Sequence, residues 1–156
     1  MKTKIYILAI CVFAISSFIF SSCDETDKGD TTKPVIDLIE PEEGVALRIG
    51  SENGVHLEMD LSDNEMLASY KVEIHNNFDN HGHTRAGNES VPFTFENNWD
   101  VSGKKNIHIH HHEIKIPENA TEGNYHLMVY CTDAAGNETY VARNIVLSYD
   151  AVDDED

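Results

Sequence analysis

Apolar residues recur at every second position through much of the segment from Pro34 to Tyr149. In Val55 to Leu61 and in Tyr70 to His75 the alternation with polar residues is strict. A period of two is typical of β-strands with one buried and one exposed face, and turn residues interrupt the pattern about every ten positions. The pattern therefore predicts an all-β fold for residues 34–149.

The expected strands each have an apolar side and a more polar side. The first strand covers residues 35–39 and 45–49 and is broken at Pro41. The other expected strands cover residues 55–61, 70–74, 91–95, 107–116, 125–131 and 140–149. No part of this region has the 3.6-residue period of a helix longer than one turn. About seven half-buried strands are typical of an immunoglobulin-like antiparallel β-sandwich, which is the fold that we predict.

The N-terminal residues have the pattern of an export signal. Two lysines precede an apolar run from Ile5 to Phe20, which is shorter than the roughly 20 residues that span a bilayer. The run ends in Phe20-Ser21-Ser22-Cys23, and small residues directly before a cysteine resemble a lipobox. We expect residues 1–22 to be a lipoprotein signal peptide and Cys23 to be the lipid attachment site. An ordinary cleaved signal with a chance cysteine is the alternative.

Residues 23–33 are polar and lack periodicity, so we expect them to be an acidic tether between the lipid and the sandwich. The run Asp24 to Asp27 resembles the signal that sends Bacteroidota lipoproteins to the outer face of the outer membrane. We therefore expect an outer-membrane protein, anchored by lipid and exposed at the cell surface. A solvated linker is the alternative interpretation of this run. Residues 150–156 form an acidic tail.

The charge of the chain excludes one class of partner. There are 28 acidic and 11 basic residues, for a net charge of −17. Such a surface repels phosphate backbones, so we expect no binding to nucleic acid. Because Cys11 leaves with the signal and Cys23 carries lipid, Cys131 has no partner for an intramolecular disulfide. Its place on the apolar side of a strand predicts a buried thiol.

Two segments carry a resemblance to known proteins. Gly123 to Asn137 resembles the penultimate strand of bacterial immunoglobulin-like modules, in which a Tyr begins the strand and Asp-x-x-Gly-Asn turns the chain. Asp60 to Glu65 resembles their turn between the second and third strands. Together with Ile74 to His83, these segments make the mature domain similar to a Bacteroidota family of Ig-like lipoproteins catalogued as a domain of unknown function. The resemblance implies the fold and carries no activity.

Histidine is the most unusual component, with nine residues. In an alternating sandwich, the ends of strands 70–74 and 107–116 share one pole with the starts of strands 55–61 and 125–131. Eight of the nine histidines should gather there, with His108 a short way down its strand. Parity points His75 and His126 outward on neighbouring strands, about 5 Å apart. With His81 and His83 on the next loop, they form our expected zinc or copper site.

A second grouping of histidines lies on the outward face of the other sheet. It consists of His56, His108, His110 and His112. The alternation of 107–116 changes phase near His111, which predicts a β-bulge that redirects one imidazole. Outward histidines on strands are also found simply solvated, and this alternative applies to both groupings.

The opposite pole should carry oxygen ligands from two turns. Asp60, Asp63 and Asp133 are the candidates for calcium there. However, EF-hand spacing is absent, and aspartate is an ordinary turn residue, so calcium is not the ion that we favour.

The sequence lacks the motifs of common catalytic sites, so we do not expect an enzyme. We expect a lipoprotein that binds a transition metal, or a metal-bearing ligand, at the histidine pole and passes it to an outer-membrane transporter. The alternative is a non-catalytic adhesion or accessory module that binds a glycan or a protein. In that case the histidines are incidental, and Trp99, with Phe93, Phe95 and Tyr70, is the candidate contact surface.

Overall fold

The computed structural model of the chain describes residues 29–77 and 90–153. The predicted signal peptide, Cys23, His81, His83 and the end of the acidic tail lie outside the described residues. In the described part, no helix is long and apolar enough to cross a bilayer.

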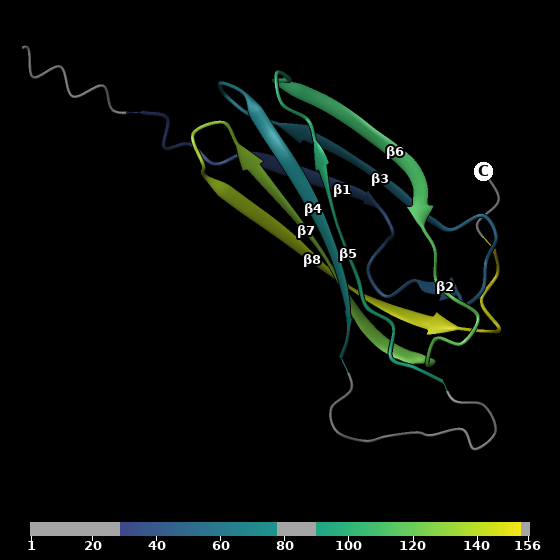
Figure 1. Cartoon of the computed structure of the whole chain (residues 1–156). Helices are drawn as coiled ribbons and strands as arrows, with labels where there is room; N and C mark the ends of the chain where they lie inside the picture. The colour runs from purple at the N-terminus through teal and green to yellow at the C-terminus, as the bar shows by residue number, and fades with distance from the viewer. Residues whose placement is uncertain (1–28, 78–89, 154–156) are drawn as a thin grey trace, which may run out of the picture.

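Within these described residues, eight strands form two sheets that lie face to face (Figure 1). They are β1 (Val35–Glu40), β2 (Ala46–Arg48), β3 (Val55–Ser62), β4 (Leu67–Asn76), β5 (Phe95–Asp100), β6 (Asn106–Ile114), β7 (Gly123–Asp133) and β8 (Glu138–Ser148). The smaller sheet has the order β1-β3-β6 and the larger one β2-β8-β7-β4-β5. This arrangement confirms the predicted β-sandwich and the expected pairing of 70–74 with 125–131.

The core follows directly from the alternation. The inward residues of β3, β4 and β7 are at most 3% exposed, and each strand contributes at least three of them. The apolar ones are Val55, Leu57, Met59, Leu61, Leu67, Tyr70, Val72, Ile74, Tyr125, Leu127, Val129 and Cys131. Each side chain of this size contributes about 1.5–3 kcal/mol when it is fully buried. The prediction that Cys131 is a buried thiol is confirmed.

Two details differ from the sequence prediction. The pairing of β2 with β8 is parallel, because the chain crosses from one sheet to the other after the cis bond Glu40–Pro41. The expected strand at 91–95 is displaced to β5, and Val91 makes only an isolated bridge to Ala120. The alternation of apolar and polar residues does not predict β5, because this strand pairs only with β4 and has few apolar residues.

Tyr125 fixes the start of β7. Its side chain is fully buried, and its hydroxyl donates to the carbonyl of Thr121 at 2.7 Å and accepts from the amide of Phe93 at 3.2 Å. A tyrosine that bonds backbone a few residues upstream is a feature of immunoglobulin-like sandwiches. The Tyr that the resemblance places at the start of this strand therefore has a structural role.

The predicted β-bulge is present in β6. Val55 pairs with Ile114 and Leu57 with His111, so one more residue separates the two partners on β6 than on β3. The extra residue lets Ile114 return to the core while His112 stays on the outward face. The bulge therefore sets the direction of the histidines at this end of the sheet.

Candidate metal centre

The outward face of the smaller sheet carries a ladder of polar residues. On β3 these are His56, Glu58 and Asp60, and on β6 they are His108, His110 and His112. Cross-strand register places Glu58 opposite His110 and Asp60 opposite His108. His56 faces the bulged end of β6, so it lies between the rings of His110 and His112.

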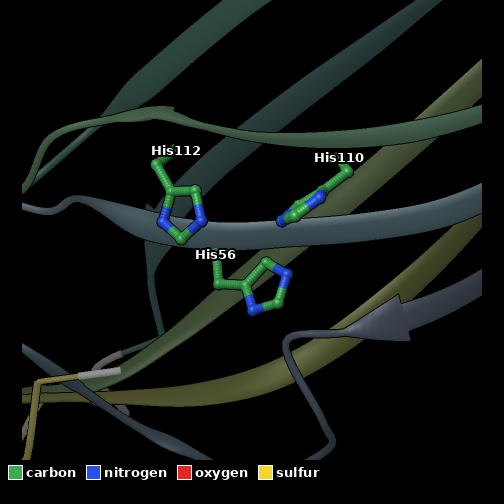
Figure 2. Close-up of side chains that lie close together, drawn as sticks. All are labelled: His56, His110 and His112. Atoms are coloured by element: carbon green, nitrogen blue, oxygen red, sulfur yellow. The ribbon is translucent and has the colours of Figure 1, made fainter. Parts of the chain in front are cut away.

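Three of these imidazoles converge. Each of His56, His110 and His112 offers one ring nitrogen, and the three nitrogens lie within 4.8 Å of one another. The centroid of the His56 ring is 4.8 Å from that of His110 and 4.9 Å from that of His112, and the His110 and His112 centroids are 5.7 Å apart. Figure 2 shows the three rings around a common space.

The spacing fits a transition-metal ion after a small closure. Zinc binds imidazole nitrogen at about 2.0–2.1 Å, so two nitrogens of a tetrahedral site are about 3.4 Å apart. The His56 and His112 rings are now stacked, with an interplanar angle of 15°. Rotation about their side-chain bonds, with nitrogen movements of about 1–1.5 Å, aims both at one ion.

Glu58 lies beside the three rings. One of its carboxylate oxygens is 3.6 Å from Nε2 of His56, and the other is 3.6 Å from Nε2 of His108. A carboxylate next to a ligating histidine commonly orients the ring and makes it a better ligand. His56 also lines an open surface hollow together with residues of β2 and of the segment after β8. An ion at this position therefore stays accessible from solution.

His108 does not join the cluster, although the sequence analysis groups it with His56, His110 and His112. It lies one step further along the ladder, and its Nδ1 is 2.9 Å from a carboxylate oxygen of Asp60. This correction follows from register, which places His108 opposite Asp60, four residues along β3 from His56.

His111 points between the sheets, as the bulge predicts. Its Nε2 is 3.1 Å from the hydroxyl of Tyr70, and its ring lies 5.0 Å from that of Trp99. Burial lowers the pKa of His111, against the opposing effect of the nearby Glu113 carboxylate. His111 is therefore a neutral packing residue rather than a ligand of the outward cluster.

The first predicted grouping is present only in part among the described residues. His75 and His126 are cross-strand partners, and their ring centroids are 5.5 Å apart, as parity predicts. Nε2 of His126 lies 2.9 Å from the side-chain amide of Asn77. His81 and His83 lie outside the described residues. This pair belongs to the larger sheet, so the two groupings share one end of the sandwich but lie on opposite outer faces.

At the other end, Asp60 does not join Asp63 and Asp133, because its side chain points outward to His108. Instead, Asp30 completes a group of three carboxylates whose oxygens lie within 4.8 Å of one another. Asp30 is not among the ligands predicted from the sequence, because residues 23–33 are expected there to be a tether without structure. No local pattern marks the contact of Asp30 with the turns.

The aromatic residues proposed as a contact surface mostly pack. Tyr70 and Phe93 are buried, and Phe95 and Trp99 are partly buried against the core. Trp99 stacks on Tyr70 with ring centroids 4.8 Å apart and donates to a carboxylate oxygen of Glu113 at 2.8 Å. These contacts join β5 to β6 at their facing edges.

Comparison with protein-family models identifies the family of the chain. The model of a family described as a domain of unknown function, DUF4625, matches residues 21–148. No curated protein matches the chain. The match confirms the predicted resemblance to a domain of unknown function and includes the whole described sandwich.

Proposed function

We propose that this chain, which belongs to the DUF4625 family of domains of unknown function, binds a transition-metal ion through His56, His110 and His112. The observation that carries the proposal is the convergence of three imidazoles from two strands, with ring nitrogens within 4.8 Å of one another. Imidazole nitrogen suits zinc and copper, which are the ions that we propose.

The three residues have separate roles in this site. His56 approaches the ion from β3, while His110 and His112 approach it from β6 on either side of that ring. Glu58 orients His56 and adds negative charge beside the ion. Three histidines leave a fourth position for water, for a small ligand or for a donor of a partner protein. The net charge of −17 attracts cations to the surface.

Calorimetric titration with zinc chloride tests the proposal. The full-length chain is used, in a mild detergent because of its apolar N-terminal run. We expect one saturable site, and we expect the triple variant His56→Ala/His110→Ala/His112→Ala to bind zinc at least about tenfold more weakly, because its three nitrogen ligands are gone. Copper is tested in the same way.

The double variant His75→Ala/His126→Ala is the matched control, because it removes outward histidines from the other sheet. We expect it to keep the zinc affinity of the unchanged chain. If the double variant loses binding and the triple variant keeps it, the ion belongs to the grouping of His75, His81, His83 and His126 instead. Equal affinity in all three proteins refutes a histidine site of either kind.

Zinc affinity should also depend on pH. Only neutral imidazole binds a metal, so protons compete with zinc once the pH falls below about 6.5. The charged and titratable groups near the site are Glu58 and, one step away, His108 with Asp60. Arg48, Asp150 and Asp153 line the same hollow as His56. We expect a steep loss of affinity between about pH 7 and pH 5.5. An affinity that does not change over this range contradicts coordination by histidine.

The proposed location is the outer membrane, with the sandwich held at the cell surface by lipid on Cys23. This rests on the lipobox resemblance and on the acidic residues that follow it. An accessible metal site on such a domain suits delivery of the ion to an outer-membrane transporter. The variant Cys23→Ala should move the protein from the membrane fraction to the soluble fraction, and it should no longer incorporate labelled fatty acid. Unchanged labelling would exclude acylation at Cys23.

A non-catalytic adhesion or accessory module is the alternative function. Pull-down from cells with and without a chelator separates it from metal binding. If a partner is retained equally with and without chelator, and equally by the triple histidine variant and the unchanged chain, the result favours this alternative.

A further inference from the structure

Three segments meet at the end of the sandwich opposite the histidine pole. They are the β3–β4 turn, the β7–β8 turn and the residues before β1, which Figure 1 shows running beside the β7–β8 turn. The side-chain amide of Asn137 donates to the carbonyl of Asp30 at 3.0 Å and lies 3.3 Å from the carbonyl of Thr32. Each segment brings one aspartate to this place.

The three carboxylates lie close together, and two of them are nearly buried. One oxygen from each of Asp30, Asp63 and Asp133 lies within 4.8 Å of the others. Asp63 is only 7% exposed and Asp133 only 2%. Oδ1 of Asp63 accepts from the amides of Glu65 and Met66, whereas its Oδ2 is buried and has no hydrogen-bond partner. A buried carboxylate oxygen without a partner costs free energy unless something compensates its charge.

Within residues 29–77 and 90–153, neutral side chains donate to two of these carboxylates, Asn64 to Oδ1 of Asp30 at 3.1 Å and Asn137 to Oδ2 of Asp133 at 2.7 Å, but no positive charge balances them. No lysine, arginine or histidine of this part forms an ion pair with Asp30, Asp63 or Asp133. Two nearly buried carboxylates beside an apolar core are a site where a cation is strongly favoured.

We propose that Asp30, Asp63 and Asp133 bind a calcium ion that ties the segment before β1 to the end of the sandwich. All the available ligands are oxygens, which a hard cation prefers. Calcium binds oxygen at about 2.3–2.6 Å, so two ligands on opposite sides of one ion are up to about 5 Å apart. The observed limit of 4.8 Å falls inside this span. The carbonyls of Asp30 and Thr32 are further oxygens beside the group.

Calcium fits this place better than magnesium. Magnesium requires near-ideal octahedral geometry at about 2.0–2.1 Å and keeps several waters, whereas calcium accepts irregular sets of carboxylates and carbonyls. The side chains of Asp63 and Asp133 are nearly buried and leave little room for a hydrated magnesium ion. With ligands from three separate segments, the bound ion would order residues 29–34, directly before β1.

Calorimetric titration with calcium chloride tests this site on the full-length chain in detergent. We expect one saturable site with a dissociation constant of about 10⁻⁴–10⁻³ M, as in extracellular calcium modules. Asp63→Asn and Asp133→Asn should each weaken binding at least about tenfold, and Asp30→Asn at least about threefold. An equal concentration of magnesium should not displace the ion.

Asp60→Asn is the matched control, because Asp60 is an aspartate of β3 that bonds to His108 outside the group. It should bind calcium as the unchanged chain does. Asp30 is less buried than Asp63 and Asp133, so Asp30→Asn decides the matter if the two buried variants fail to fold. In the unchanged chain, calcium should slow amide hydrogen exchange of residues 29–34, and Asp30→Asn should abolish this effect.

Absence of saturable binding overturns the proposal, and so does an Asp30→Asn variant that binds calcium like Asp60→Asn. The triple histidine variant should keep its calcium affinity. Failure of the calcium site is therefore distinguishable from failure of the proposed transition-metal site.

Discussion

At the edge between β5 and β6, the protonation of one residue, His111, is coupled to the stability of the fold. The ring of His111 is packed against Tyr70 and Trp99, and burial lowers its pKa. The same packing raises the pKa of Tyr70 well above its ordinary value. Both groups are therefore held neutral, and the hydrogen bond between them is a neutral pair inside the sandwich.

This arrangement predicts a pH-dependent stability. An unfolded histidine takes up a proton below about pH 6.5, whereas folded His111 resists protonation. As the pH falls below about 6.5, the unfolded state binds more protons and the free energy of unfolding decreases. The charged neighbours are Glu113, which opposes the shift, and His110 and His112, which add to it.

Urea unfolding at about pH 7.5 and pH 5.5, with a chelator present, measures this effect. His111→Phe should lose about 1 kcal/mol at the higher pH through the missing Tyr70 hydrogen bond, and its stability should fall less on acidification. His75→Phe, on an outward face, is the control. If acidification lowers the free energy of unfolding equally in the His111 variant and in the unchanged chain, His111 is not the source of the pH dependence.

At the scale of elements, the β6 bulge determines which histidines meet. It turns His111 inward and keeps His112 beside His56 on the outward face. Gly54, directly before β3, makes room for it. Its φ is +88°, and a Cβ at this position would lie 2.4 Å from the carbonyl oxygen of His112 and 2.9 Å from that of Ile114. The bulge and this glycine therefore form one structural unit.

Replacement of Gly54 should disturb both the fold and the metal centre. Gly54→Ala carries backbone strain of about 1–3 kcal/mol, and the clash with the bulge adds to it. Gly103→Ala is the matched control, because Gly103 has a φ of +79° and a Cβ added there would have no atom within 4 Å. We expect a larger loss of stability, and weaker zinc binding, only for Gly54→Ala. Equal effects of the two substitutions would contradict this role for the bulge.

At the scale of the whole molecule, the two proposed metal sites lie at opposite ends of one sandwich. The histidine site joins β3 to β6 in the smaller sheet, and the aspartate site joins three segments at the other pole. They share no residue, and no charged side chain contacts both groups among the described residues. We therefore expect their effects on stability to be independent.

Thermal unfolding with zinc, with calcium and with both ions tests this independence. An ion that binds only the folded state raises the stability by about 2.7 kcal/mol at 100 times its dissociation constant. The stabilisation with both ions should equal the total of the separate effects within about 0.5 kcal/mol. A joint effect clearly different from this total would show that the two ends are coupled.

The sequence by itself determined the sandwich, its buried strands and the bulge in β6. These features depend on the local alternation of apolar and polar residues, and a phase change within one strand is visible without any partner. Alternation also predicted that His75 and His126 stand side by side, because parity and the neighbouring order of their strands are enough for that.

Only the tertiary structure decided which ligands converge. His56, His110 and His112 meet while His108 faces Asp60, because the register of β3 against β6 comes from pairing between distant segments. Asp30 joins Asp63 and Asp133, in place of Asp60, because a stretch without periodicity packs against two turns. A ligand set depends on distances of a few ångströms between residues far apart in sequence, and local patterns contain no information about such distances.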